Sequence, residues 1–339
     1  MIRTARLSLA SFLVMLRLTS HPDAIHAQVG SAIAADSNAR VYFIDAIRNR
    51  LWKVDPDGHL TTLSVRVRHH DQIALNPKGA VWFVHGFFPS EMRWSLRGVS
   101  PDGSFHDVDR PTRIPVFSGS MLAMDDALNI YWVSLTELVR VTPDDSLSVW
   151  ARPVEMTDAR FGILGPDSAL YVADSNRVLR VPKSGPEAVL AGSYDAGYAD
   201  APGPGARFNR PTGLAVDSGG NVYVADYGNR RLRKISRSGV ATTLVEEPWP
   251  WIPTGVAVAG GDVYLLERAG DYYGRTLPPF MLIPAVADLL GSPRVRRLAP
   301  NGAAVTLVGV RRRGVVLLLL GSLVAGVGLV GWRVKRSRS

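Results

Sequence analysis

The sequence of 339 residues contains no cysteine. The chain can therefore form no disulfide framework, and it has neither a thiolate metal ligand nor a cysteine nucleophile. It also lacks the nucleophile elbow, the phosphate-binding loop and the metalloprotease motif that mark common enzyme classes. Stability must come from the packing of a large core, and no local motif assigns a catalytic reaction.

Basic residues are plentiful but unevenly placed. The formal net charge is +9 and the pI is near 10.0. Many of the arginines and lysines flank two apolar segments near the ends of the sequence: Arg3, Arg6, Arg311, Arg312, Arg313, Arg333, Lys335, Arg336 and Arg338. Such positions are typical of membrane topology signals. The sequence leaves no separate basic domain, so we expect no nucleic-acid partner.

Two segments predict an exported protein with a membrane anchor. Residues 1–27 combine a basic start, an apolar core and a small residue at Ala27, which predicts a signal peptide. Residues 314–332 are 19 residues without a charge, long enough to span a bilayer as a helix. The body would then lie outside the cytoplasm, with residues 333–339 as a short basic cytoplasmic tail.

Each of these interpretations has an alternative. The N-terminal segment could remain as an unprocessed apolar helix, and the C-terminal one could be a buried helix of a soluble domain. A third arrangement is a tail-anchored protein whose body stays in the cytoplasm.

Between the two apolar segments the sequence repeats. Similar five-residue segments begin 40, 49, 40, 52 and 41 residues apart, and each belongs to a set of four short β-patterned runs separated by turn residues. The segments are Val41 to Asp45, Val81 to His85, Ile130 to Ser134, Leu170 to Asp174, Val222 to Asp226 and Val263 to Glu267.

Six copies of a four-strand unit predict an all-β fold, a six-bladed β-propeller of four-stranded antiparallel blades over residues 29–309. The C-terminal transmembrane helix would follow it. Radial packing gives each blade two neighbours and leaves only short edges. We see no strand borrowed from one end of the chain to complete the last blade.

The most regular unit runs from Pro211 to Val245. Its core, GLAVDSGGNVYVADYGNRRLRK, resembles an NHL repeat, and the segment from Gly192 to Gly213 is similar to the linker that often precedes such repeats. Blade 4 keeps the pattern in LYVADSNRVLRV. Blades 2, 3 and 6 depart from it, with His85, Ser134 and Glu267 where Asp226 stands. The resemblance implies a propeller that binds other molecules; NHL-like propellers include scaffolds, lyases and lactonases.

Because the strands of a blade alternate in direction, the second strands of all blades end on the same face of the propeller, here called the top face. The links between blades reach the same face. Four long insertions are expected there: residues 85–94, 107–120, 192–211 and 269–293. We therefore expect function on the top face.

The residues that end the second strands would form a ring on that face: Asp45, His85, Ser134, Asp174, Asp226 and Glu267. One interpretation is a ligand- or metal-binding ring. The alternative is that an acid followed by Asn and Arg accepts hydrogen bonds from the backbone of its turn. The neighbouring basic run, Arg230 to Lys234, is expected on a solvated blade edge.

Histidines offer a more specific metal hypothesis. His70 and Asp71 lead into the first strand of blade 2, opposite His85. These three side chains could hold Ca or Zn, as in catalytic metal sites. His69 and His70 cannot both face one ion on a regular strand. The alternative is surface histidines, with no cofactor.

The insertion in blade 6 is apolar between Gly274 and Leu290 and lies close to the predicted anchor. It predicts membrane contact by Phe280, Met281, Leu282 and Ile283, with Arg311, Arg312 and Arg313 at acidic headgroups. The alternative is a lid over the channel mouth.

Together these features predict a membrane-anchored, extracytoplasmic binding or scaffold module for a protein, a glycan or a small ligand. The alternative is a metal-dependent lactonase- or lyase-like enzyme with its site on the top face.

Overall fold

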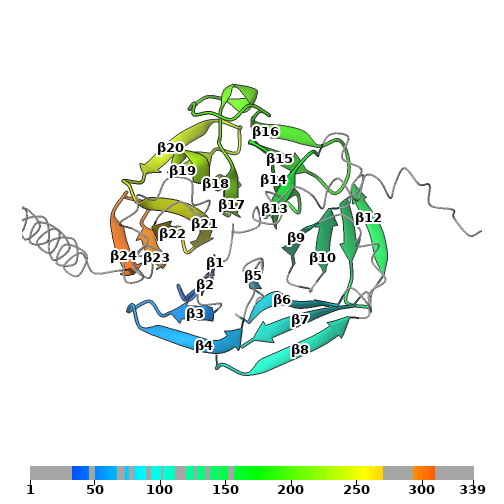
Figure 1. Cartoon of the computed structure of the whole chain (residues 1–339). Helices are drawn as coiled ribbons and strands as arrows, with labels where there is room; N and C mark the ends of the chain where they lie inside the picture. The colour runs from blue at the N-terminus through cyan, green and yellow to red at the C-terminus, as the bar shows by residue number, and fades with distance from the viewer. Residues whose placement is uncertain are drawn as a thin grey trace, which may run out of the picture.

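The computed structural model of the protein describes residues 33–45, 50–66, 73–75, 80–88, 93–100, 102–110, 120–125, 127, 129–133, 138–144, 146–151, 156–269 and 293–309. The strands in these ranges form six four-stranded antiparallel sheets arranged in a ring (Figure 1). The prediction of an all-β propeller is confirmed, and each sheet corresponds to one predicted blade. The predicted signal peptide and transmembrane segment lie outside the described ranges, within which no helix is long and apolar enough to cross a membrane.

The strands of the first three blades follow the chain. Blade 1 contains β1 (Ile33–Ala35), β2 (Val41–Asp45), β3 (Arg50–Val54) and β4 (Leu60–Arg66). Blade 2 contains β5 (Ile73–Leu75), β6 (Val81–Phe88), β7 (Arg93–Val99) and β8 (Phe105–Arg110). Blade 3 contains β9 (Ser120–Met124), β10 (Ile130–Val133), β11 (Leu138–Val141) and β12 (Leu147–Ala151).

The other three blades have the same order. Blade 4 contains β13 (Ala159–Leu164), β14 (Leu170–Asp174), β15 (Arg177–Val181) and β16 (Ala188–Gly192). Blade 5 contains β17 (Pro211–Val216), β18 (Val222–Asp226), β19 (Arg231–Ile235) and β20 (Ala241–Glu246), with short 3₁₀ turns η1 (Gly203–Gly205) before it and η2 (Tyr227–Asn229) within it. Blade 6 contains β21 (Trp251–Ala259), β22 (Asp262–Ala269), β23 (Pro293–Leu298) and β24 (Ala304–Val308). In each blade the first strand faces the centre of the ring and the fourth lies on its circumference (Figure 1).

Second strands are buried on both faces. Every residue of β2, β14 and β18 is buried, because a neighbouring blade packs on each side of the sheet. This is why the repeated segments read as continuous apolar runs that end in a single acid.

The core consists of clusters between adjacent blades. Phe161, Tyr171 and Val178 of blade 4 pack with Leu214 and Val224 of blade 5. Similar clusters join blades 1 and 2, blades 3 and 4, and blades 5 and 6. Burial of apolar surface thus holds the blades together at these junctions.

The junction of blades 6 and 1 closes the ring. Ile33 and Phe43 of blade 1 pack with Tyr264, Leu266 and Val295 of blade 6. Each of the two sheets consists of four consecutive strands. The described strands therefore agree with the prediction that neither end of the chain lends a strand to the other.

Some loops were predicted wrongly. In blade 2 the segment expected as a loop from His85 to Trp94 lies partly in strands, because β6 continues to Phe88 and pairs with β7 from Arg93. In blade 6 the second strand was expected to end at Glu267 but continues, opposite Trp251, to Ala269, which is the residue where the insertion was predicted to begin. Cross-strand pairing continues as long as both strands stay in register, which an apolar or aromatic sequence favours.

The linker from residue 192 to residue 211 was predicted to stay on the top face, and this is wrong. It descends along the outer edge of blade 5, where the backbone N–H of Ala241 donates to Ala201 O at 3.0 Å. Gly203 N then donates to Gly239 O at 2.9 Å, in the hairpin of the opposite face. Ala206 and Phe208 are buried in the core between blades 4 and 5 as the linker returns. The linker is part of this junction and does not decorate the top face alone.

Candidate functional site on the top face of blades 4 to 6

Three of the predicted ring residues, Asp45, Asp174 and Asp226, end their second strands as expected, and Glu267 lies two residues before the end of β22. Asp45, Asp174, Asp226 and Glu267 are all buried. Each stands opposite an arginine on the third strand of its blade: Asp45 faces Arg50, Asp174 faces Arg177, Asp226 faces Arg231 and Glu267 faces Arg294. Ser134 lies outside the described residues. His85 lies within β6, but its side chain is outside the described part of the chain.

In blade 4 the carboxylate of Asp174, at the end of β14, links the turn that follows this strand to the backbone that precedes β13. Its Oδ1 accepts the backbone N–H groups of Thr157 at 2.9 Å and Asp158 at 2.6 Å. Its Oδ2 accepts two bonds from the Arg177 guanidinium, at 3.0 Å from Nε and 2.8 Å from Nη2. The carboxylate therefore has donors on both oxygens, and the backbone donors are the two residues that precede β13.

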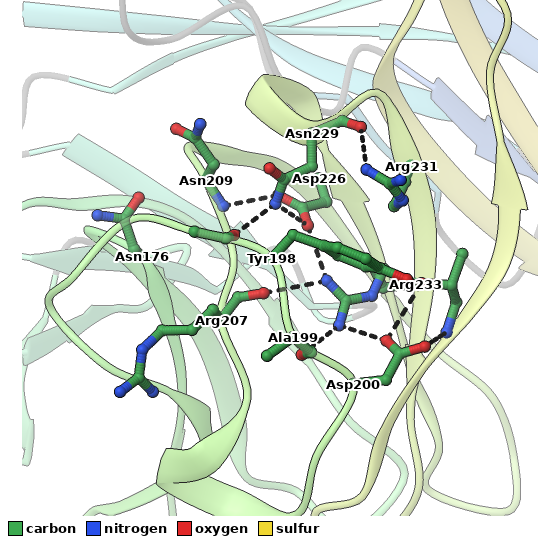
Figure 2. Close-up of polar contacts among 12 residues, drawn as sticks. Asn176, Tyr198, Ala199, Asp200, Arg207, Asn209, Asp226, Asn229, Arg231 and Arg233 are labelled. Atoms are coloured by element: carbon green, nitrogen blue, oxygen red, sulfur yellow. Dashed lines mark hydrogen bonds and ion pairs between the residues drawn. The ribbon is translucent and has the colours of Figure 1, made fainter.

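In blade 5 the carboxylate of Asp226 occupies the same place. It accepts Asn209 N at 2.8 Å, Asn229 Nδ2 at 2.8 Å and Arg233 Nη1 at 3.0 Å (Figure 2). Burial raises the pKa of Asp226 to about 6, although the hydrogen bonds from Asn209, Asn229 and Arg233 act in the opposite direction.

Arg233 extends this network into the linker. Its Nη1 also donates to Arg207 O at 3.0 Å, and its Nη2 donates to Ala199 O at 2.8 Å and to Asp200 Oδ1 at 2.6 Å (Figure 2). The side chain is completely buried. The expectation of a solvated basic edge is therefore wrong for this residue, because the two arms of the linker cover it.

Blade 6 holds a different cluster, which combines two glutamates with two arginines. Glu267 accepts Arg294 Nη2 at 2.6 Å, Arg294 Nε at 2.7 Å and Arg296 Nε at 3.0 Å. Glu247, from the connection between β20 and β21, accepts Arg294 Nη2 at 2.7 Å and also bonds Arg296. The indole of Trp251 lies 4.0 Å from the Arg294 guanidinium carbon.

Burial dominates the electrostatics of this cluster. It raises the pKa of Glu267 to about 7, against the opposing effect of Arg294, and it lowers the pKa of Arg296. Both shifts have the same cause, since removal of water disfavours the charged form of either group.

A divalent metal does not fit Asp174, Asp226 or Glu267, because their oxygens already accept N–H groups of arginine, asparagine or the backbone. Within the described residues no three His, Asp or Glu side chains come together as ligands. His70 and Asp71 lie outside those residues, so the Ca or Zn site with His85 stays a prediction. The predicted membrane contacts at residues 280–283 and 311–313 also lie outside the described ranges.

Three aromatic side chains are among the exposed groups on this face, beside polar residues such as Asp195 and Glu246. Tyr194 is 45% exposed and Tyr198 is 50% exposed, and both belong to the linker. Tyr194 O accepts Asn176 Nδ2 at 2.8 Å, and Gly197 O accepts Asn229 Nδ2 at 2.6 Å, so this part of the linker lies on the turns that follow the second strands. Trp249, 61% exposed, lies in the connection after β20.

Sequence reasoning missed this aromatic set and the partners of the acids. One available signal was Arg177, three residues after Asp174; in blade 5 the partner Arg233 lies seven residues after Asp226, beyond the nearer Arg230 and Arg231. Glu247 has no counterpart in the repeat, and no pattern in the sequence identified it.

Comparison with known protein families identifies one part of this site. Residues 208–235, which carry Asp226, Asn229 and Arg233, match the description of the NHL repeat. This segment is an NHL repeat. The match covers β17 to β19, so the most regular predicted unit is also the part of the chain where the resemblance is confirmed. None of the curated proteins matches the sequence.

Several solved structures share the fold of this chain. An auxiliary nutrient binding protein from Bacteroides ovatus is 13% identical, with 70% of this chain and 66% of that chain covered and a TM-score of 0.57. A luciferin-regenerating enzyme is 17% identical, with 81% and 92% covered and a TM-score of 0.51. A gluconolactonase from Xanthomonas campestris is 14% identical, with 72% and 84% covered and a TM-score of 0.50. At these identities the likeness concerns the fold alone.

Proposed function

We propose that the protein is a binding module that recognises a protein partner through aromatic side chains on the top face of blades 4 to 6. The observation that carries this proposal is the contrast between buried acids and exposed rings. The carboxylates of Asp174, Asp226 and Glu267 are engaged inside the fold, whereas Tyr194, Tyr198 and Trp249 are 45%, 50% and 61% exposed.

The two tyrosines are held in place before any partner arrives. The Tyr194 ring lies 4.1 Å from the Arg177 guanidinium carbon, and the Tyr198 ring lies 3.9 Å from that of Arg231. Arg231 is itself fixed by Glu246 at 2.9 Å. A ring fixed on one side loses little conformational entropy when a partner covers the other side, which favours binding.

The composition of this surface favours a protein partner over a small ligand. Residues that contribute most to protein–protein affinity are enriched in tryptophan, tyrosine and arginine. Tyr194, Tyr198 and Trp249 are spread over two connections between blades, whereas a small molecule is usually enclosed in a concave pocket.

The location that we propose is the outer side of a membrane, with the propeller anchored through residues 314–332. The support comes from the sequence of the two apolar segments. In addition, β24 ends at Val308 on the face where the second strands end, a few residues before the predicted span. The binding surface would then lie near the bilayer, and a membrane-associated partner would meet it readily.

Site-specific photo-crosslinking tests the proposal. A photoreactive phenylalanine analogue replaces Trp249 in the full chain, expressed in the cells that produce it, and a matched control replaces Leu147 on the circumference of blade 3, which is 48% exposed. We expect a discrete protein adduct at position 249 that the control does not form. Identical adducts at both positions, or none at either, would contradict the proposal.

A further inference from the structure

The connection that carries Trp249 is anchored at both ends. On one side the Glu247 backbone N–H donates to Arg230 O at 2.8 Å, and the Glu247 carboxylate binds Arg294 and Arg296. On the other side the Trp251 ring lies 4.0 Å from the Arg294 guanidinium carbon. Trp249 lies between these anchors and exposes most of its side chain, so its position depends on how firmly Arg294 and Arg296 hold Glu247.

Glu267 competes for the same two arginines. The Nη2 atom of Arg294 donates to Glu247 Oε2 at 2.7 Å and to Glu267 Oε1 at 2.6 Å, so the two carboxylates converge on one nitrogen. Arg296 contacts both glutamates as well. Both carboxylate side chains have no exposed surface, and each arginine side chain is 14% exposed. Solvent therefore screens the competition very little.

We propose that uptake of a proton by Glu267 tightens the connection from Glu247 to Trp251, so that the position of Trp249 responds to pH. When Glu267 is ionised, two guanidinium groups are shared between two carboxylates. When Glu267 is protonated, Glu247 becomes the single anion for both arginines, and the attraction that holds the connection increases. We call the set of Glu247, Glu267, Arg294 and Arg296 the clasp. Its biological role rests on the proposed function, because Trp249 belongs to the proposed binding surface.

The groups around Glu267 support this assignment. From β23 it faces Arg294 and Arg296, and from the connection it faces Glu247, which reaches it through Arg294. From β21 its ladder partner is Pro253, which does not titrate. Among the described residues, no other charged side chain forms a hydrogen bond or ion pair with Glu267.

The titration of Glu267 falls in a useful range. Burial raises its pKa from 4.5 to about 7. A group whose pKa is higher in the folded state favours folding when it is protonated, so its contribution is complete below about pH 4.5 and is lost as the pH rises through about 7. The direction of this pH dependence agrees with a connection that is held more tightly below about pH 7 than above it.

Hydrogen exchange measured by mass spectrometry tests the clasp directly, because it needs no ligand. The full chain in detergent is followed between about pH 5.5 and about pH 8.5, with correction for the intrinsic exchange rate. The peptide that contains Glu247, Trp249 and Trp251 reports on the connection. In the unmodified chain we expect its protection to fall several-fold, up to about tenfold for each pH unit, as the pH rises through about 7.

Two variants separate the clasp from general loosening. Glu267→Gln should keep the connection protected at every pH, and Glu247→Gln should leave it unprotected at every pH. Asp174→Asn, which removes the corresponding acid of blade 4, should leave the pH dependence of the connection as it is. Protection independent of pH in the unmodified chain, or an unchanged pH dependence in Glu267→Gln, would overturn the proposal.

The outcome is also independent of the crosslinking at position 249. Failure of the crosslink together with the expected exchange pattern would overturn the proposed binding function and support the clasp. The expected crosslink with exchange that does not respond to pH would do the reverse.

Discussion

The side chains of Arg233 and Asp226 are both completely buried, and Arg233 Nη1 lies 3.0 Å from Asp226 Oδ2 in blade 5. Arg233 also binds Asp200 and two linker carbonyls. The pair therefore joins the NHL repeat to the segment that fills the junction between blades 4 and 5. A buried ion pair seldom adds net stability, but removal of one partner leaves an uncompensated charge.

Arg233→Ala should destabilise the propeller by about 3–5 kcal/mol, because Asp226 loses its buried cationic partner and the carbonyls of Ala199 and Arg207 lose the donor that Arg233 supplies. The measurement is the free energy of unfolding from denaturant titration. Arg180→Ala is the matched control, since Arg180 pairs with Asp167 while 38% of its side chain is exposed, and it should cost under about 1 kcal/mol. Equal losses in the two variants would refute the role assigned to Arg233.

Gly192 should not accept a side chain. Its φ is +92°, and an added Cβ would lie 2.6 Å from Asn176 O. Gly58, with a φ of +86° and nothing within 4 Å of an added Cβ, is the control. Gly58→Ala should cost about 1–2 kcal/mol from the left-handed backbone alone. Gly192→Ala should cost clearly more, because atoms at the linker junction must also move; a similar loss in both variants would show that the junction is loose.

Asp226 should make stability depend on pH in the acid range. Burial raises its pKa from 3.8 to about 6, so the protonated carboxyl favours folding below about pH 4 and this contribution is lost as the pH rises to about 6. Asp200 continues to neutralise Arg233 when Asp226 is protonated. In Asp226→Asn the decline of the unfolding free energy between about pH 4 and about pH 6 should be smaller, by up to about 1.4 kcal/mol for each pH unit. Parallel curves of unfolding free energy against pH would contradict the assignment.

Metal analysis of the purified chain tests the enzyme alternative. The account predicts that neither Ca nor Zn is bound stoichiometrically, because the described acids bind N–H donors. The chain is analysed after dialysis, beside His85→Ala. Stoichiometric metal that disappears in His85→Ala would favour the predicted site of His70, Asp71 and His85.

The sequence was sufficient to predict the propeller because each blade repeats the same pattern of four short apolar runs separated by turn residues. The segment Val222–Asp226 and its counterparts are apolar runs that end in a polar residue, and turn residues separate them. Local patterns of this kind report which strands pair with their neighbours in the chain. The strand set follows from them, whereas Asp226 was expected in a ring on the top face and its complete burial was not predicted.

The remaining features depend on contacts between residues far apart in the sequence. Arg233 is buried only because Ala199 and Arg207, which lie 34 and 26 residues earlier, fold over it. Glu247 reaches Arg294 and Arg296 from the preceding blade connection, outside the repeat. Alternation along a strand could divide the basic run between two faces, but it could not show that the linker covers one of them.

The central claim is that the exposed aromatic residues bind the partner and that the ring acids support the fold. The most direct test uses the partner protein that the crosslink at position 249 identifies. Its affinity for purified variants of the propeller is measured, and each affinity is corrected for the fraction of the variant that is folded. Trp249→Ala and Tyr198→Ala should each weaken binding about tenfold or more, whereas Asp226→Asn, once folded, should bind like the unmodified chain. Unchanged affinity in the aromatic variants together with lost binding in folded Asp226→Asn would contradict the account.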